Sequence, residues 1–195
     1  MTPRDLAAPA AVTLALCVTP FVGLDGALLN LLIFMMIIAL AAQGWNILGG
    51  FGGLASFGHA AFFGTGAYAT AILQTKAGLG AWPSLFAGVA LGAAVGAFIG
   101  FLSFRSGLRG SYFALITLAF AEVLRLIANN WVDFTNGPMG LSGVAQPALL
   151  ADASPLMAKR FYFYLALALT AVALYMAYRF VYSNNGRAAV TVREN

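Results

Sequence analysis

Charged residues are scarce in this sequence of 195 residues. Asp, Glu, Lys and Arg together make up 8% of it, while hydrophobic residues make up 62%. Soluble domains carry about 25% charged residues, so this composition excludes a water-soluble globular protein. The apolar runs are unbroken and rich in Leu, Ala and Phe, whereas the strands of a membrane barrel alternate in polarity. The sequence therefore predicts an all-α membrane protein, because helices satisfy their own backbone hydrogen bonds in lipid.

Several kinds of chemistry lack the residues that they need. The single cysteine, Cys17, cannot form an intrachain disulfide, and its apolar neighbours predict a buried thiol. The single histidine, His59, and the single cysteine do not have the spacing of a metal site. No G-x-x-x-x-G-K-[ST] motif is present, so the chain has no P-loop with which to bind ATP. The basic residues form no dense cluster, which argues against nucleic acid as a partner. We expect the chain to bind no metal and no cofactor.

The apolar runs predict a polytopic transmembrane helix bundle with about six spans, forming a single domain over residues 1–195. The spans are expected at residues 7–24, 27–48, 59–75, 82–104, 111–127 and 161–182. Pro20 should kink the first span or end it early. The one long polar stretch, residues 129–160, is rich in glycine and proline and should lie outside the hydrocarbon.

The distribution of basic residues predicts the orientation of the bundle. With a cytoplasmic N-terminus, the basic residues on the cytoplasmic side are Arg4, Arg105, Arg109, Arg179, Arg187 and Arg193. Those on the outer side are Lys76, Lys159 and Arg160. Because Lys and Arg favour cytoplasmic loops, both termini are expected in the cytoplasm.

A glycine-rich segment at residues 49–58 predicts a break between the second and third helices. The polar or flexible residues at this break are Gly49, Gly50, Gly52, Gly53, Ser56 and His59. A broken helix frees backbone groups at membrane depth, and transporters use such breaks beside their substrate path. A plain interfacial turn accounts for the glycines equally well.

The spacing of Ser56 and His59 also allows an intramembrane Ser-His hydrolase. No third residue that would orient the imidazole is evident, and the motif around the serine is incomplete. A histidine near a helix start more often caps the helix or packs against it. We therefore assign no catalytic residue.

Glycine recurs every four residues along one face of the fourth span. The positions are Gly88, Gly92, Gly96 and Gly100. Such a stripe lets the backbone of another helix approach closely, so it predicts a packing surface within the bundle.

Glu122 and Arg125 are the most costly residues within the predicted spans. An ionised group deep in a bilayer costs at least ~2.5 kcal/mol on insertion scales, so both need partners. Their i, i+3 spacing lets them pair on one helical face, and Arg125 is near enough to the outer end to snorkel. A structural pair and a role in a permeation path both remain open, and Glu122 is the better functional candidate.

Two ordered motifs point to a family. The first is the glycine-rich run Trp45–Tyr68, and the second is Leu108–Arg125 with the loop Thr135–Gly143 after it. Both resemble the LivM-type permeases of branched-chain amino acid ABC importers, and the similarity extends from about Asn30 to the end of the chain.

This resemblance implies a permease subunit in a bacterial inner membrane that works by alternating access and is not itself an enzyme. The implied partners are a homologous second permease, two cytoplasmic ATPases that use the ATP, and a periplasmic substrate-binding protein. The implied substrate is a branched-chain amino acid or a related compound, and a passive channel remains an alternative.

The family continues beyond Asn195 with a coupling segment and further spans, so the resemblance implies that this chain corresponds to the N-terminal part of a permease. It would then be a fragment, the product of a truncated gene, or a half-permease completed by another chain. The residues that would then contact the ATPase are Gly186, Arg187, Arg193 and Glu194.

Overall fold

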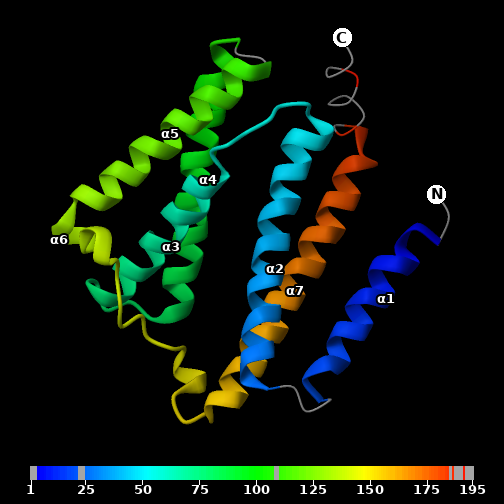
Figure 1. The fold of residues 1–195 in the computed structure, drawn as a ribbon, viewed down its shortest axis with the longest axis vertical. Coiled ribbons are helices and arrows are strands. Elements are labelled where there is room, and N and C mark those ends of the chain that lie inside the picture. The colour runs from blue at the N-terminus through cyan, green and yellow to red at the C-terminus, as the bar shows by residue number, and fades with distance from the viewer. Residues whose placement is uncertain (1–3, 22–24, 108–109, 185, 187–190, 192–195) are drawn as a thin grey trace. The chain divides into compact units, whose positions relative to one another are not determined.

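The computed structural model describes residues 4–21, 25–107, 110–184, 186 and 191 (Figure 1). All regular structure in these residues is helical. The helices that are long and apolar enough to cross a membrane cover Gly26–Phe51, Ala81–Arg105, Gly110–Asn130 and Pro155–Val181. The helices α1 (Arg4–Val18) and α3 (His59–Thr75) are shorter. The predicted all-α, membrane-spanning architecture is confirmed.

The chain divides into two compact units. The first comprises residues 1–47 and 152–195, and the second comprises residues 48–151. Large apolar side chains are exposed in both units, among them Phe34 and Met35 in the first and Phe86 and Phe98 in the second. Such extensive apolar exposure is what a helix surface in contact with lipid requires.

In the first unit, α2 (Gly26–Trp45) packs along α7 (Pro155–Val181), as Figure 1 shows. The buried core between them consists of Leu29, Met36, Phe163 and Leu167. At the start of both helices, Lys159 Nζ donates a hydrogen bond of 3.3 Å to the carbonyl of Gly26. Further along both, Thr170 Oγ1 lies 3.4 Å from the carbonyl oxygen of Met36. The two helices therefore run parallel.

The helix α1 lies against α7 and runs in the opposite direction. Near the end of α1, the carbonyl of Cys17 accepts a hydrogen bond of 3.1 Å from the hydroxyl of Tyr164, near the start of α7. Cys17 is partly buried, whereas the sequence predicted a buried thiol. The helix ends at Val18 and continues as a 3₁₀ turn, Thr19–Phe21, in which Pro20 is buried. Proline lacks the amide hydrogen that an α-helix needs, and the α-helix ends just before Pro20, as the prediction of an early end at this residue expected.

In the second unit, α3 and α4 (Ala81–Arg105) form an antiparallel hairpin. Its turn contains Gly78 in the left-handed region, with φ of +64°. The helix α5 (Gly110–Asn130) packs on α3. Two contacts show that α5 runs parallel to α3. Just before α3, Phe57 bonds Thr117 in the first half of α5. Just after α3, the Nζ of Lys76 lies 5.4 Å from the ring of Phe134, which follows α5.

The helix directions within each unit are those that consecutive membrane crossings produce. In the first unit α2 and α7 are parallel and α1 is antiparallel to them; in the second unit α3 and α5 are parallel and α4 is antiparallel. A chain that crosses six times in the order α1, α2, α3, α4, α5, α7 alternates in this way.

The predicted polar stretch at residues 129–160 is shorter and more structured than expected. It contains the short helices α6 (Val132–Thr135), η3 (Gly137–Met139) and η4 (Ala148–Leu150). The last span begins at Pro155, where the hydroxyl of Ser154 accepts the amide hydrogen of Met157 at 3.3 Å. A serine cap followed by proline is a strong start signal, so the prediction that this helix begins at Phe161 was late.

The glycine-rich break is also shorter than predicted. After α2 the chain continues as a π-helix, Asn46–Phe51, so Gly49 and Gly50 are helical. The helix ends where Gly53 adopts a φ of +67° and the amide of Leu54 donates to the carbonyl of Leu48 at 3.1 Å. A left-handed glycine is a common way to end a helix. The irregular backbone covers Gly52–Gly58, and the prediction that it begins at Gly49 was wrong.

Candidate functional site

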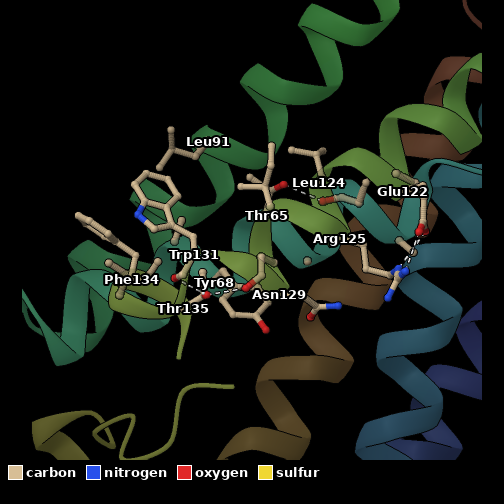
Figure 2. Close-up of a pocket in the computed structure, with 18 of the residues that line it drawn as sticks. Thr65, Tyr68, Leu91, Glu122, Leu124, Arg125, Asn129, Trp131, Phe134 and Thr135 are labelled. Carbon is tan, nitrogen blue, oxygen red and sulfur yellow. Dashed lines mark hydrogen bonds and ion pairs between the residues drawn. The ribbon is translucent and has the colours of Figure 1, made fainter. Parts of the chain in front are cut away.

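The second unit contains a groove of about 680 Å³ between α3, α5 and α6 (Figure 2). The polar side chains that line it are Thr65, Tyr68, Glu122, Arg125, Asn129 and Thr135. The other lining residues are Phe57, Ala60, Ala61, Gly64, Ala69, Ile72, Leu73, Leu91, Leu118, Ala121, Leu124, Ile127, Ala128, Trp131 and Phe134. The volume lies within the ~300–1,000 Å³ typical of small-molecule sites, and such sites combine an apolar wall with a few placed polar groups.

The charged residues of the groove form one ion pair on α5. Arg125 Nε donates to Glu122 Oε2 at 2.8 Å, and the terminal nitrogen of Arg125 donates to Glu122 Oε1 at 2.6 Å. The side chains remain 59% exposed for Arg125 and 51% for Glu122. The predicted i, i+3 pairing is confirmed. Ionised groups in a span avoid hydrocarbon. This exposed pair must therefore face either a polar neighbour or the groove, and not lipid.

The α6 end of the groove is aromatic and well ordered. In Figure 2, Trp131 and Phe134 stand at the opposite end from Glu122 and Arg125. The two rings are tilted, with centroids 4.6 Å apart, and the Nζ of Lys76 lies 5.4 Å from the centre of the Phe134 ring. The hydroxyl of Thr135 lies 2.8 Å from the carbonyl oxygen of Trp131 and holds α6 to its own start. The groove therefore has the ion pair at one end and the aromatic rings at the other.

The irregular segment before α3 is attached to α5 at Thr117. The amide of Phe57 donates to Thr117 Oγ1 at 3.2 Å, and that hydroxyl donates in turn to the carbonyl of Ala114 at 2.9 Å. A side chain at Gly58 would lie only 2.9 Å from the carbonyl oxygen of Thr117. Sequence reasoning missed Thr117, although a hydroxyl in an otherwise apolar run was the available signal. This attachment places Phe57 in the wall of the groove.

Of the residues predicted to border a substrate path, Glu122 lines the groove. The others are not among the residues that line it: Gly49, Gly50, Gly52, Gly53, Ser56 and His59. Ser56 is 2% exposed, and its hydroxyl accepts the amide hydrogen of Gly58 at 3.3 Å. His59 begins α3, and its ring meets that of Phe62 edge-on with centroids 5.7 Å apart. These contacts give Ser56 a turn-forming role and His59 a packing role.

The glycine stripe of α4 divides into two halves. A side chain at Gly88 would meet Thr70 Oγ1 and the carbonyl oxygen of Gly66, the latter at 2.6 Å. A side chain at Gly92 would lie 3.0 Å from the carbonyl oxygen of Phe62. Gly96 has ordinary contact distances of at least 3.9 Å from Phe62, and at Gly100 the contact within reach is Phe104 of the same helix. The close crossing of α3 and α4 therefore lies at Gly88 and Gly92, opposite Gly66, which sequence reasoning did not identify.

The residues predicted to contact an ATPase lie at the chain end. Gly186 is buried, and its amide donates to Ser183 Oγ at 3.2 Å. Arg187, Arg193 and Glu194 lie outside the described residues.

Helices of membrane length with apolar, exposed surfaces define a multi-pass α-helical membrane protein. Residues 27–195 match the family described as the permease component of branched-chain amino acid transport systems, and the chain belongs to this family. Over 114 residues, 58% of its length, the chain is 38% identical to the high-affinity branched-chain amino acid transport system permease protein LivM of Escherichia coli K12. The identity and coverage are the same for LivM of Salmonella typhimurium LT2. The matched stretch spans 26% of each relative. No solved structure matches the chain.

Proposed function

We propose that this chain forms part of a permease subunit that moves branched-chain or related amino acids across a bacterial inner membrane by ATP-driven alternating access. The observation that carries the proposal is the groove of the second unit, which joins one ion pair to a long apolar wall. An amino acid with an apolar side chain has the same two parts. Membership of the permease family supports a transport role rather than an enzymatic one.

The hairpin, the irregular segment and the groove each have a role in the proposed transport. The crossing of α3 and α4 at Gly66 and Gly88 makes a rigid hairpin, because backbones in contact leave no room to slide. The segment Gly52–Gly58 supplies a flexible connection, since it lacks the hydrogen-bonding ladder of a helix. The groove, between the hairpin and α5, is then the place where solute meets this chain, exposed in turn to each side of the membrane.

These 195 residues contain no P-loop, and we place the energy source in separate ATPase subunits. We place the chain beside a homologous second permease, above two cytoplasmic ATPases, with a periplasmic binding protein delivering the substrate. Both termini lie in the cytoplasm in this arrangement, as the distribution of basic residues favours.

Uptake of labelled leucine by proteoliposomes tests the proposal. The importer is assembled from this chain and its co-expressed partner subunits, and uptake is expected to require ATP on the side of the ATPases. Substitution of the P-loop lysine in the ATPase should abolish uptake, whereas continued flow down the gradient would identify a passive channel. Ser56→Ala should retain uptake, because the hydroxyl forms a turn; a protein that hydrolyses a substrate and loses that activity with Ser56→Ala would instead be the hydrolase.

A further inference from the structure

The ion pair of the groove has unused hydrogen-bonding capacity on both charges. A guanidinium carries five N–H donors and a carboxylate about four acceptor positions. Arg125 uses two donors on Glu122, and Glu122 accepts those two with its two oxygens. No other hydrogen bond to either charged group is found in the part of the chain that the structure describes. Three donors of Arg125 and about two acceptor positions of Glu122 are thus available to a ligand.

The surroundings of the pair select the kind of ligand. Leu118, Leu124 and Ile127 of α5 line the groove next to the pair, and Trp131 and Phe134 line its far end. With a rise of 1.5 Å per residue, Trp131 lies about 14 Å along the helix axis from Glu122. A ligand that fits this groove carries a compact positive and negative charge at one end and an apolar body.

We propose that Glu122 and Arg125 bind the charged end of an α-amino acid, with Arg125 holding the α-carboxylate, Glu122 holding the α-ammonium group, and the apolar wall receiving the side chain. This inference rests on the proposed transport function and assigns the recognition step to this site. The planar guanidinium matches a carboxylate through two parallel N–H donors, so a free α-carboxylate is the feature that Arg125 recognises.

Charge balance allows Glu122 and Arg125 to exchange each other for the two charges of a zwitterionic ligand. When a zwitterion enters, one ion pair within the chain becomes two pairs with the ligand, so neither protein charge loses its counter-charge. An amide or alcohol derivative brings the ammonium group alone and leaves Arg125 with no anionic partner once Glu122 has turned to the ligand. Once a bound ligand covers the pair from water, leaving one of its charges unpaired is strongly unfavourable. The site should therefore select leucine over leucinamide.

A charge-swapped variant separates ligand binding from a merely structural pair. Glu122→Arg with Arg125→Glu keeps an i, i+3 ion pair on α5 but reverses the order of its charges along the groove. The assembled importer is tested for leucine uptake beside Glu122→Gln, Arg125→Gln and the matched control Arg105→Gln, which removes a charge stacked on Phe101 of α4, outside the groove. Basal ATP hydrolysis without leucine verifies assembly of each variant.

We expect about tenfold or greater loss of uptake in both single variants and in the swapped variant, and uptake within about twofold of wild type in the control. Wild-type uptake by the importer with the swapped pair would overturn the inference, because it would mean that the ion pair only stabilises helix α5. If the swapped chain fails to assemble, a competition experiment decides. Unlabelled leucine and leucinamide are compared as inhibitors of labelled leucine uptake by wild type and by Arg125→Gln. A preference for leucine over leucinamide that falls to about one in Arg125→Gln supports the inference, and an unchanged preference overturns it. A wild-type importer that takes up no amino acid would contradict the proposed function itself, which is a different result.

Discussion

Gly88 lies where α3 and α4 cross at close range, and its missing side chain is what permits the crossing. An added Cβ there would overlap Thr70 Oγ1 and approach the carbonyl oxygen of Gly66 to 2.6 Å. Thr70 Oγ1 already donates to that same carbonyl at 2.8 Å, so the side chain cannot move without losing its hydrogen bond. Gly100, on the same helix, meets an ordinary contact of 3.6 Å with Phe104.

The same substitution at the two glycines should therefore give different results. Gly88→Ala is expected to lower the free energy of unfolding by about 1–3 kcal/mol, which corresponds to a fall in Tm of roughly 2–10 °C. Gly100→Ala should leave Tm within about 2 °C of wild type. Thermal unfolding in detergent, followed by size-exclusion chromatography, measures both. Equal effects at the two positions would show that the crossing does not depend on Gly88.

At the scale of elements, the segment Gly52–Gly58 is irregular in backbone but fixed at its end. Its attachment is the hydrogen bond from the amide of Phe57 to Thr117 Oγ1, together with the close contact of Gly58 with Thr117. In the proposed transport cycle the segment moves at Gly52 and Gly53 while Phe57 stays in the groove wall. The segment would then act as a joint with one anchored end.

Removal of the anchor should release the segment. Thr117→Val keeps the shape of the side chain but leaves the partly buried amide of Phe57 without its acceptor, at a cost of about 1–3 kcal/mol. Hydrogen exchange at residues 52–58 is expected to become faster by about tenfold or more. Thr75→Val is the matched control, because the hydroxyl of Thr75 donates to the Ala71 carbonyl of its own helix and lies outside the segment. Unchanged exchange in Thr117→Val would contradict the anchoring role.

Helix bounds and the pairing of side chains within a helix could be predicted from the sequence in several places. The helix predicted at residues 59–75 is observed with those bounds, because glycines before it and a glycine-containing turn after it mark both ends. The pairing of Glu122 with Arg125 followed from helix geometry alone. The π-helical turn at Gly49 and Gly50 did not, since glycine weakens a helix without dictating where the helix ends.

The site itself was only partly predictable. Glu122 was identified because a charge in a span is costly. Its groove depends on α3, α5 and α6 meeting, and tertiary contacts between helices of similar apolar composition leave little pattern in a sequence. Trp131 and Phe134 were placed in a polar loop, and only the structure brings their rings to the end of the groove. Thr117 and Gly66 were missed for the same reason.

At the scale of the whole molecule, each unit supplies one kind of part. The first unit holds the parallel pair α2 and α7, whose core of Leu29, Met36, Phe163 and Leu167 contains no charged group. The second unit holds the hairpin, the joint and the groove. Solute must reach this groove if the chain transports it there, because every proposed function places the substrate in the groove.

Cysteine labelling of the assembled importer tests this requirement most directly. Ala121 lines the groove, while Ala119, two residues away on α5, is exposed outside it. In a Cys17→Ser background, a cysteine introduced by Ala121→Cys should react with a membrane-impermeant thiol reagent, react at least about fivefold more slowly when leucine is bound, and change its rate when nucleotide is bound. A cysteine introduced by Ala119→Cys should show neither dependence. If the Ala121→Cys variant is labelled at a rate that neither leucine nor nucleotide alters, the groove is not on the solute path and the account is contradicted.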